Sequence, residues 1–233
     1  MSVKGVIFDC DGTLLDSMGI WQSLELKIAE HAGISLSEEE RITLNANTPT
    51  QTARYFHEVY NVGSSPQEVL SHMDDVLEMF YRYEVQPRRG AVELVEELKR
   101  RRIHMTVVSS SPGSLLKLGL ERVGIYSYFD EVISSCDMGI SKRGPLCVLR
   151  AQAKMHTEAE ETWGFEDSAY AAEVLANQHF GAIGVYDTDL AGTTEELAQV
   201  CDAVLQELDE LDVDCFVRGE YRRSLAQSCC GVA

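Results

Sequence analysis

The chain has 233 residues, of which 45% are hydrophobic, 25% charged and 8% aromatic, a composition that excludes disordered, collagen-like and low-complexity proteins. Its 38 acidic and 20 basic residues give a formal net charge of −18. A surface with that charge repels nucleic acids and anionic membranes, so we expect neither as a partner.

The first half of the chain combines one strand with a helical block. Residues 4–8 form an apolar run that stops at Asp9, which is typical of a buried strand in a parallel sheet. Residues 16–82 show helical spacing instead, with Pro49 and Pro66 at two predicted helix starts. We predict about four helices there and no strand. Two apolar stripes mark helix faces: Ile20, Trp21, Leu24 and Ile28, and then Val69, Met73, Val76, Phe80 and Tyr83.

After residue 86 the pattern alternates between helix and strand. This alternation predicts right-handed crossovers and a doubly wound parallel sheet, so the expected fold class is α/β. The predicted strands are 103–108, 131–134, 162–165, 182–185 and 203–205, and the helices are 91–98, 112–123, one following residue 145, and 168–177.

The helical block therefore reads as an all-helical cap inserted after the first strand. We expect a catalytic core with a Rossmann-like sheet from residues 1–14 and 87–212, and the cap from residues 15–86. Periodicity fades near residue 212, so residues 213–233 are expected to be a C-terminal tail.

Polar residues follow three of the predicted strands. Asp9 and Asp11 follow the first, Ser109 follows the strand over 103–108, and Glu166 and Asp167 follow the strand over 162–165. Ligands of open α/β sheets bind outside the carboxyl ends of the strands. We therefore expect these side chains to meet in one crevice.

The residue types in this crevice indicate phosphoryl chemistry. Four carboxylates repel one another unless a cation lies among them, and hard oxygen ligands suit Mg²⁺. Ser109 offers a hydroxyl before a helix N-terminus, which favours an anion. Lys142 precedes another predicted helix and adds a compact positive charge. Mg²⁺, hydroxyl and ammonium together can neutralise the charge on a transferring phosphoryl group.

These residues also carry a family resemblance. The run Asp9-x-Asp11-Gly12-Thr13-Leu14-x-Asp16-Ser17 resembles the first motif of the haloacid dehalogenase (HAD) superfamily. Ser109, Lys142 and the run Glu166-Asp167-Ser168 follow in the order of its other three motifs. A helical insertion after the first motif is similar to the cap of the branch that holds beta-phosphoglucomutase and many small-molecule phosphatases. The resemblance covers about residues 3 to 187.

The resemblance implies roles for the acidic residues. Asp9 would be the nucleophile that forms an aspartyl-phosphate, and Asp11 would be the general acid and then the general base. Mg²⁺ would be held by Asp9, by the backbone carbonyl of Asp11 and by Asp167, with help from Glu166.

It also implies how the phosphoryl group is bound. Ser109 and the backbone N–H of Ser110 would hold phosphoryl oxygens, and Lys142 would offset the charge on that group and on Asp9. The cap would close over the crevice and select the leaving group.

Several positions depart from the pattern of that branch. Its phosphosugar mutases carry a histidine early in the cap, where this chain has Trp21, and a cap arginine near the place of Pro49. Hydrolysis is therefore favoured over phosphoryl shuttling. Arg143, Leu146 and Ala171 differ from the usual third and fourth motifs without removing a chemical group.

We expect an Mg²⁺-dependent phosphatase that acts on a small phosphorylated metabolite such as a sugar phosphate, as a monomer or weak homodimer. Two alternatives stay open: a mutase like beta-phosphoglucomutase, and a non-catalytic binder of a phosphorylated ligand. The sequence shows no signal peptide, no spanning apolar segment and no zinc-type spacing among its 7 cysteines. A cytoplasmic protein with reduced thiols is the corresponding expectation.

Overall fold

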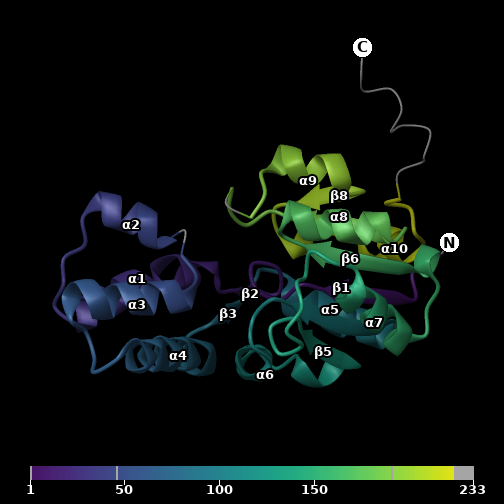
Figure 1. The fold of residues 1–233 in the computed structure, drawn as a ribbon. Helices are drawn as coiled ribbons and strands as arrows, with labels where there is room; N and C mark the ends of the chain where they lie inside the picture. The colour runs from purple at the N-terminus through teal and green to yellow at the C-terminus, as the bar shows by residue number, and fades with distance from the viewer. Residues whose placement is uncertain (1, 46, 190, 223–233) are drawn as a thin grey trace, which may run out of the picture. The chain divides into compact units, whose positions relative to one another are not determined.

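The computed structural model describes residues 2–45, 47–189 and 191–222 (Figure 1). The chain divides into two compact units. The core unit joins the residues up to Asp16 to those from Gln86 onward, and the helical unit is Ser17–Val85. The boundaries expected from the sequence lay after residues 14 and 86.

The core unit is built on a parallel sheet. Within the described residues its six strands run in the order β5-β4-β1-β6-β7-β8, which confirms the predicted doubly wound α/β fold. Strand β1 lies between β4 and β6, so the polar residues that follow these three strands share one edge of the sheet. The strands are β1 (Gly5–Phe8), β4 (His104–Ser109), β5 (Glu131–Ser134), β6 (Thr162–Glu166), β7 (Gly181–Val185) and β8 (Ala203–Leu205).

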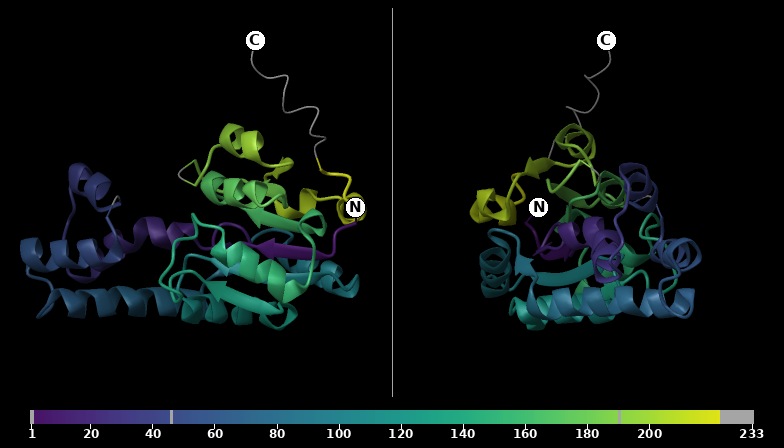
Figure 2. Two further views of the ribbon diagram at one scale, coloured as in Figure 1. Left: turned by 45° about the vertical axis from the view of Figure 1, so that its right-hand side comes forward. Right: turned by 90° about the vertical axis from the view of Figure 1, so that its left-hand side faces the viewer.

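Helices pack on both sides of these strands (Figures 1 and 2). On one face Ile7 and Val108 pack in a buried cluster with apolar residues of α7, α8 and α9. On the other face Phe8 stacks on Phe165, with ring centroids 5.0 Å apart. The helices are α5 (Ala91–Arg100), α6 (Gly113–Arg122), α7 (Leu146–Met155), α8 (Ala169–Asn177) and α9 (Thr194–Val200).

The start of the expected C-terminal tail is a docked helix instead. Val213–Val217 forms α10, and Phe216 is fully buried with its ring 5.2 Å from that of Trp163 and 5.3 Å from that of Phe165. A helix this short completes little more than one turn and so leaves no periodic pattern in the sequence. The remaining tail, 223–233 with two of the cysteines, lies outside the described residues.

The described part of the helical unit contains four helices, in agreement with the prediction. Pro49 and Pro66 begin α3 and α4, as expected from proline at a first helical position. The helices are α1 (Met18–His31), α2 (Glu38–Asn45), α3 (Pro49–Tyr60) and α4 (Pro66–Tyr83).

The buried face of α4 differs from the predicted stripe. Val69 and Met73 are buried as expected, but the buried series continues through Leu77 and Tyr81, whereas Tyr83 is 58% exposed. Both series contain Val69 and Met73. After Met73 the predicted stripe and the buried residues lie on neighbouring faces of the helix, each with helical spacing. Spacing alone therefore could not choose between them.

Two short strands pair where the chain passes between the two units. Strand β2 (Leu15–Asp16) pairs antiparallel with β3 (Gln86–Pro87), where the chain leaves and re-enters the core unit. Two residues are too few to show strand alternation, which is why the sequence predicted no strand here. The pairing brings the residues that follow β3 beside the turn that follows β1.

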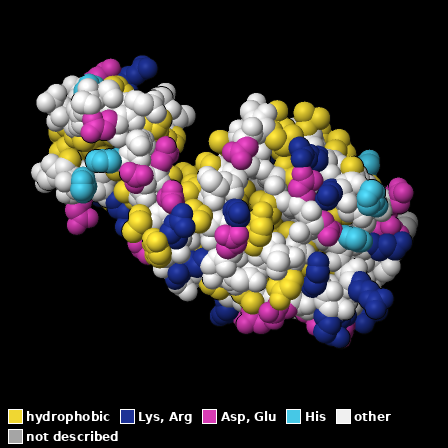
Figure 3. Space-filling view, turned by 90° about the horizontal axis from the view of Figure 1, so that it is seen from below, with side chains coloured by type: hydrophobic (Ala, Val, Ile, Leu, Met, Phe, Trp, Pro, Cys, Tyr) yellow, Lys and Arg dark blue, Asp and Glu magenta, His cyan; other side chains and the backbone are white. Residues whose placement is uncertain are grey.

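The face drawn in Figure 3 carries charges of both signs. No helix among the described residues is long and apolar enough to cross a membrane. On the face drawn in Figure 3, Lys and Arg side chains are interspersed with Asp and Glu side chains. Any strong local preference for an anion therefore has to come from a specific site.

Candidate active site

A tight turn after β1 brings two aspartates to the carboxyl edge of the sheet. Asp9 follows the strand directly, and Asp11 lies two residues further. Gly12 has a φ of +84°, which glycine adopts without strain, and the Leu15 N–H donates to the Cys10 carbonyl at 2.8 Å. The turn therefore keeps both aspartates buried, at 5% and 9% exposure.

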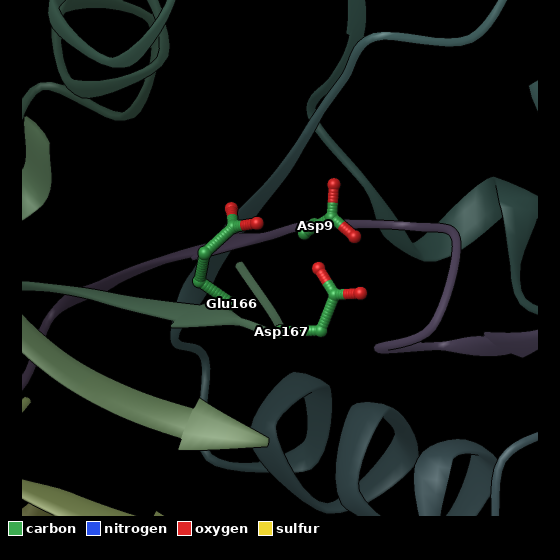
Figure 4. A group of neighbouring side chains, drawn as sticks. All are labelled: Asp9, Glu166 and Asp167. Atoms are coloured by element: carbon green, nitrogen blue, oxygen red, sulfur yellow. The ribbon is translucent and has the colours of Figure 1, made fainter. Parts of the chain in front are cut away.

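Three buried carboxylates converge at this edge, as Figure 4 shows. One carboxylate oxygen each from Asp9, Glu166 and Asp167 lies within 4.8 Å of the others. Glu166 is the last residue of β6 and Asp167 follows it. Since β6 pairs with β1 in parallel register, residues that follow the two strands are neighbours.

Lys142 is inserted among these carboxylates. Its ammonium pairs with Asp9 Oδ1 and, at 2.8 Å, with Glu166 Oε2. The Ser168 hydroxyl donates to Glu166 Oε1 at 2.8 Å, so both Glu166 oxygens have partners. Burial alone would lower the pKa of Lys142, but the two carboxylates raise it above its ordinary value. Lys142 is therefore a charged ammonium that orients Asp9.

The crowding of acidic groups in this cluster suits a divalent cation. Burial raises the pKa of Asp9 to about 8 and that of Asp167 to about 9; nearby acids add to both shifts and Lys142 opposes them. Within the described residues Asp9 Oδ2 is buried without a hydrogen-bond partner. Three carboxylates around a single ammonium make a donor set that suits Mg²⁺.

These pKa shifts predict how stability depends on pH in the absence of metal. An unfolded Asp titrates at about pH 4, whereas burial in the folded state raises the pKa of Asp9 to about 8 and that of Asp167 to about 9. In that window the folded state binds more protons, so the free energy of unfolding should fall as pH rises, by up to about 1.4 kcal/mol per pH unit for each group.

Denaturant unfolding in EDTA, at several values between about pH 5 and about pH 9, measures this fall. The Asp9→Asn variant should show a shallower decline, because one of the two titrating carboxyls is gone. Equal slopes for the wild type and the variant would contradict the assignment.

Asp11 faces the end of β4 and is held there by two serines. The Ser111 hydroxyl donates to Asp11 Oδ2 at 2.7 Å and the Ser109 hydroxyl lies 3.3 Å from the same oxygen. The Ser111 N–H donates to the Ser109 hydroxyl oxygen at 3.0 Å. Ser110, between them, is exposed. Ser111 was not singled out from the sequence, because a run of three serines does not reveal which hydroxyls point inward.

The site residues expected from the sequence thus form two adjoining groups. Contacts and short distances join Asp9, Lys142, Glu166 and Asp167, while Asp11 contacts Ser109. The first group offers a carboxylate oxygen beside an ammonium and two further acids. The second offers a carboxyl held by hydroxyls. Together they can supply a nucleophile, a proton carrier and anion-binding groups.

The model of the haloacid dehalogenase-like hydrolase family matches residues 6–181 of this chain. Fructose-1-phosphate phosphatase YqaB of Escherichia coli is 23% identical over 181 residues, which cover 78% of this chain and 95% of that protein. Pyrophosphatase PpaX of Oceanobacillus iheyensis is 24% identical over 169 residues, covering 70% and 73%. The crystal structure of beta-phosphoglucomutase from Clostridium difficile superposes with a TM-score of 0.66 at 16% identity, covering 94% of this chain and 97% of that one, a likeness of fold alone.

Proposed function

Since this chain belongs to the haloacid dehalogenase-like hydrolase family and is a phosphatase, we propose that it hydrolyses a small phosphate monoester, such as a sugar phosphate, through an aspartyl-phosphate on Asp9. The observation that carries the proposal is the difference in partners between the two carboxylate oxygens of Asp9. Lys142 holds Oδ1, while the buried Oδ2 has no hydrogen-bond partner among the described residues. Lys142 therefore orients one oxygen, and the other, which would attack phosphorus, has no competing donor among the described residues.

In the first step the bond from Asp9 to phosphorus forms as the bond from phosphorus to the leaving oxygen breaks. Asp11 gives its proton to that oxygen and then accepts one from the water that attacks the phosphoryl-aspartate. Inorganic phosphate leaves and the Asp9 carboxylate is restored. The bonds from Ser109 and Ser111 support this role, because they fix the Asp11 carboxyl at the edge of the site.

The same residues support a role for Mg²⁺. Asp9, Asp167 and the backbone carbonyl of Asp11 would hold the ion, and Glu166 would add charge to the site while it orients Lys142. The bound ion supplies electrostatic stabilisation to the phosphoryl oxygens. Lys142 offsets charge on the same group.

Ser109, together with the backbone N–H of Ser110, would bind phosphoryl oxygens. Hydroxyl and backbone N–H donors suit this task, because they stabilise negative charge without a proton transfer of their own. The contact of the Ser109 hydroxyl with Asp11, at 3.3 Å, supports this part of the proposal.

Hydrolysis of p-nitrophenyl phosphate should therefore require Mg²⁺. We expect EDTA to reduce turnover to the uncatalysed rate and added MgCl₂ to restore it, because the carboxylate cluster cannot neutralise phosphoryl charge unaided. Circular dichroism of the EDTA-treated protein controls for unfolding. Full activity in EDTA would contradict the proposal. If the activity requires Mg²⁺, a screen of phosphorylated metabolites for phosphate release identifies the substrate.

Hydrolysis is favoured over a mutase reaction by the surroundings of Trp21. Its indole N–H donates to the Tyr81 hydroxyl at 2.9 Å inside the helical unit, so this position packs the unit and offers no proton shuttle. With beta-glucose 1-phosphate, release of phosphate should therefore exceed formation of glucose 6-phosphate.

A further inference from the structure

We propose that Arg88 is a positioning residue that holds the turn carrying Asp11, a role that rests on the proposed function. Arg88 comes directly after β3, in a pair of adjacent arginines, and belongs to none of the four motifs. Its side chain is only 10% exposed, whereas that of Arg89 is 63% exposed. A buried guanidinium needs several acceptors, and those of Arg88 lie on three separate segments of the core unit.

The first segment is the turn itself. Arg88 Nη1 donates to the Gly12 carbonyl at 3.2 Å, and the Arg88 backbone N–H donates to the Leu14 carbonyl at 2.9 Å. Gly12 follows Asp11 directly and has the left-handed backbone that makes it the most permissive residue of the turn. The hydrogen bond from Arg88 to the Gly12 carbonyl therefore restricts the backbone of Gly12, and with it the position of Asp11.

The other two segments anchor the guanidinium. Arg88 Nη2 donates to the carbonyls of Tyr186, after β7, and Gln206, after β8, at 2.9 and 3.0 Å. Nη1 pairs with Asp187, and Glu207 Oε2 lies 3.4 Å from Nη2. Only the planar fork of arginine offers enough donors for this set, so a lysine cannot replace it.

These contacts complement those on the Asp11 side chain. Ser109 and Ser111 hold the carboxylate from the β4 side, whereas Arg88 holds the backbone of the turn from the β7 and β8 side. Losing Arg88 should leave the carboxylate near its serines but misaligned with the leaving oxygen. A displacement of about 1 Å in a reacting group can cost about 100-fold in rate, so a loss of about tenfold is a modest expectation.

The test compares two substrates that differ in their need for a general acid. Phenyl phosphate releases a more basic oxygen than p-nitrophenyl phosphate and depends more on proton donation. In Arg88→Met we expect kcat/KM to fall at least about tenfold for phenyl phosphate and less than about threefold for p-nitrophenyl phosphate. Arg88→Lys, which keeps the charge beside Asp187, should show the same bias. Arg89→Met, which removes only the exposed pair with Asp209, should match the wild type.

Equal losses on both substrates, or none, would overturn the positioning role. A wild type that hydrolyses neither substrate would overturn the proposed function instead, and amide hydrogen exchange then still decides the structural part. Residues 10–15 should exchange faster in Arg88→Met and Arg88→Lys but not in Arg89→Met. Unchanged exchange in that segment would show that Arg88 does not hold the turn.

Discussion

Asp9→Asn should abolish hydrolysis of p-nitrophenyl phosphate, with kcat reduced on the order of 10⁴-fold or more, a loss comparable to removing other catalytic nucleophiles. An amide lacks the anionic oxygen that must bond to phosphorus. The fold should survive, because burial already raises the pKa of Asp9 to about 8 and a neutral side chain suits that site. Lys142 keeps Glu166 as a partner in this variant.

Steady-state phosphate release measures the loss, and rapid acid quenching gives a second readout. Radiolabelled substrate should leave label on the Asp9 peptide of the wild type and none on that of the variant. Asp130→Asn is a matched control, because Asp130 is exposed and pairs with His104 on the surface of the core unit. Turnover of Asp9→Asn within tenfold of the wild type would rule out Asp9 as the nucleophile.

Lys142→Met should impair both catalysis and folding. Removing one donor that stabilises a transferring group typically costs about 10²- to 10³-fold in kcat. Breaking a buried ion pair from one side costs about 3–5 kcal/mol of unfolding free energy, because the partner charge stays buried. Asp9 and Glu166 would be those partners. Protonation of Asp9, whose pKa burial raises to about 8, removes its charge at low pH, so the loss of stability in EDTA should be larger at about pH 9 than at about pH 6.

Urea unfolding and steady-state kinetics measure the two effects separately. Arg143→Met is the neighbouring control, because Arg143 is exposed and its guanidinium lies over the Tyr170 ring, with the Cζ atom 4.1 Å from the ring centroid. Lys142→Arg keeps the charge and should restore stability more than activity, because a guanidinium directs its donors differently from the compact ammonium that orients Asp9. Wild-type stability for Lys142→Met at every pH would contradict the electrostatic role.

Regular periodic elements were the part of the fold that the sequence revealed best. Strand β5 has the predicted bounds, Glu131–Ser134, and β6 extends one residue beyond the predicted 162–165. The sequence did not reveal two short helices, α9 and α10, or the two-residue strands β2 and β3. Segments this short carry no hydrophobic period, and tertiary packing stabilises them, as Phe216 does for α10.

In the site, too, the residues predicted from the sequence follow recognisable strands, whereas those it missed are defined by contacts between distant parts of the chain. Asp9, Glu166 and Asp167 could be expected near one another because residues after neighbouring parallel strands meet at one edge. Arg88 could not, because its partners Gly12 and Asp187 lie 76 and 99 residues away in the chain. Two adjacent arginines in a sequence are typical of a solvated surface, and only the folded chain separates the buried one from the exposed one.

The pairing of β2 with β3 has a consequence for how such a protein can diversify. The two chain crossings lie side by side, with Leu15 opposite Pro87 and Asp16 opposite Gln86, and paired strands are about 4.8 Å apart. A connection of a few residues can span that gap, so the whole of Ser17–Val85 is, in geometric terms, a long hairpin loop on a finished scaffold. Because the β2–β3 pairing holds both ends of the insert, we expect changes in its length to leave the register of the six-stranded sheet intact.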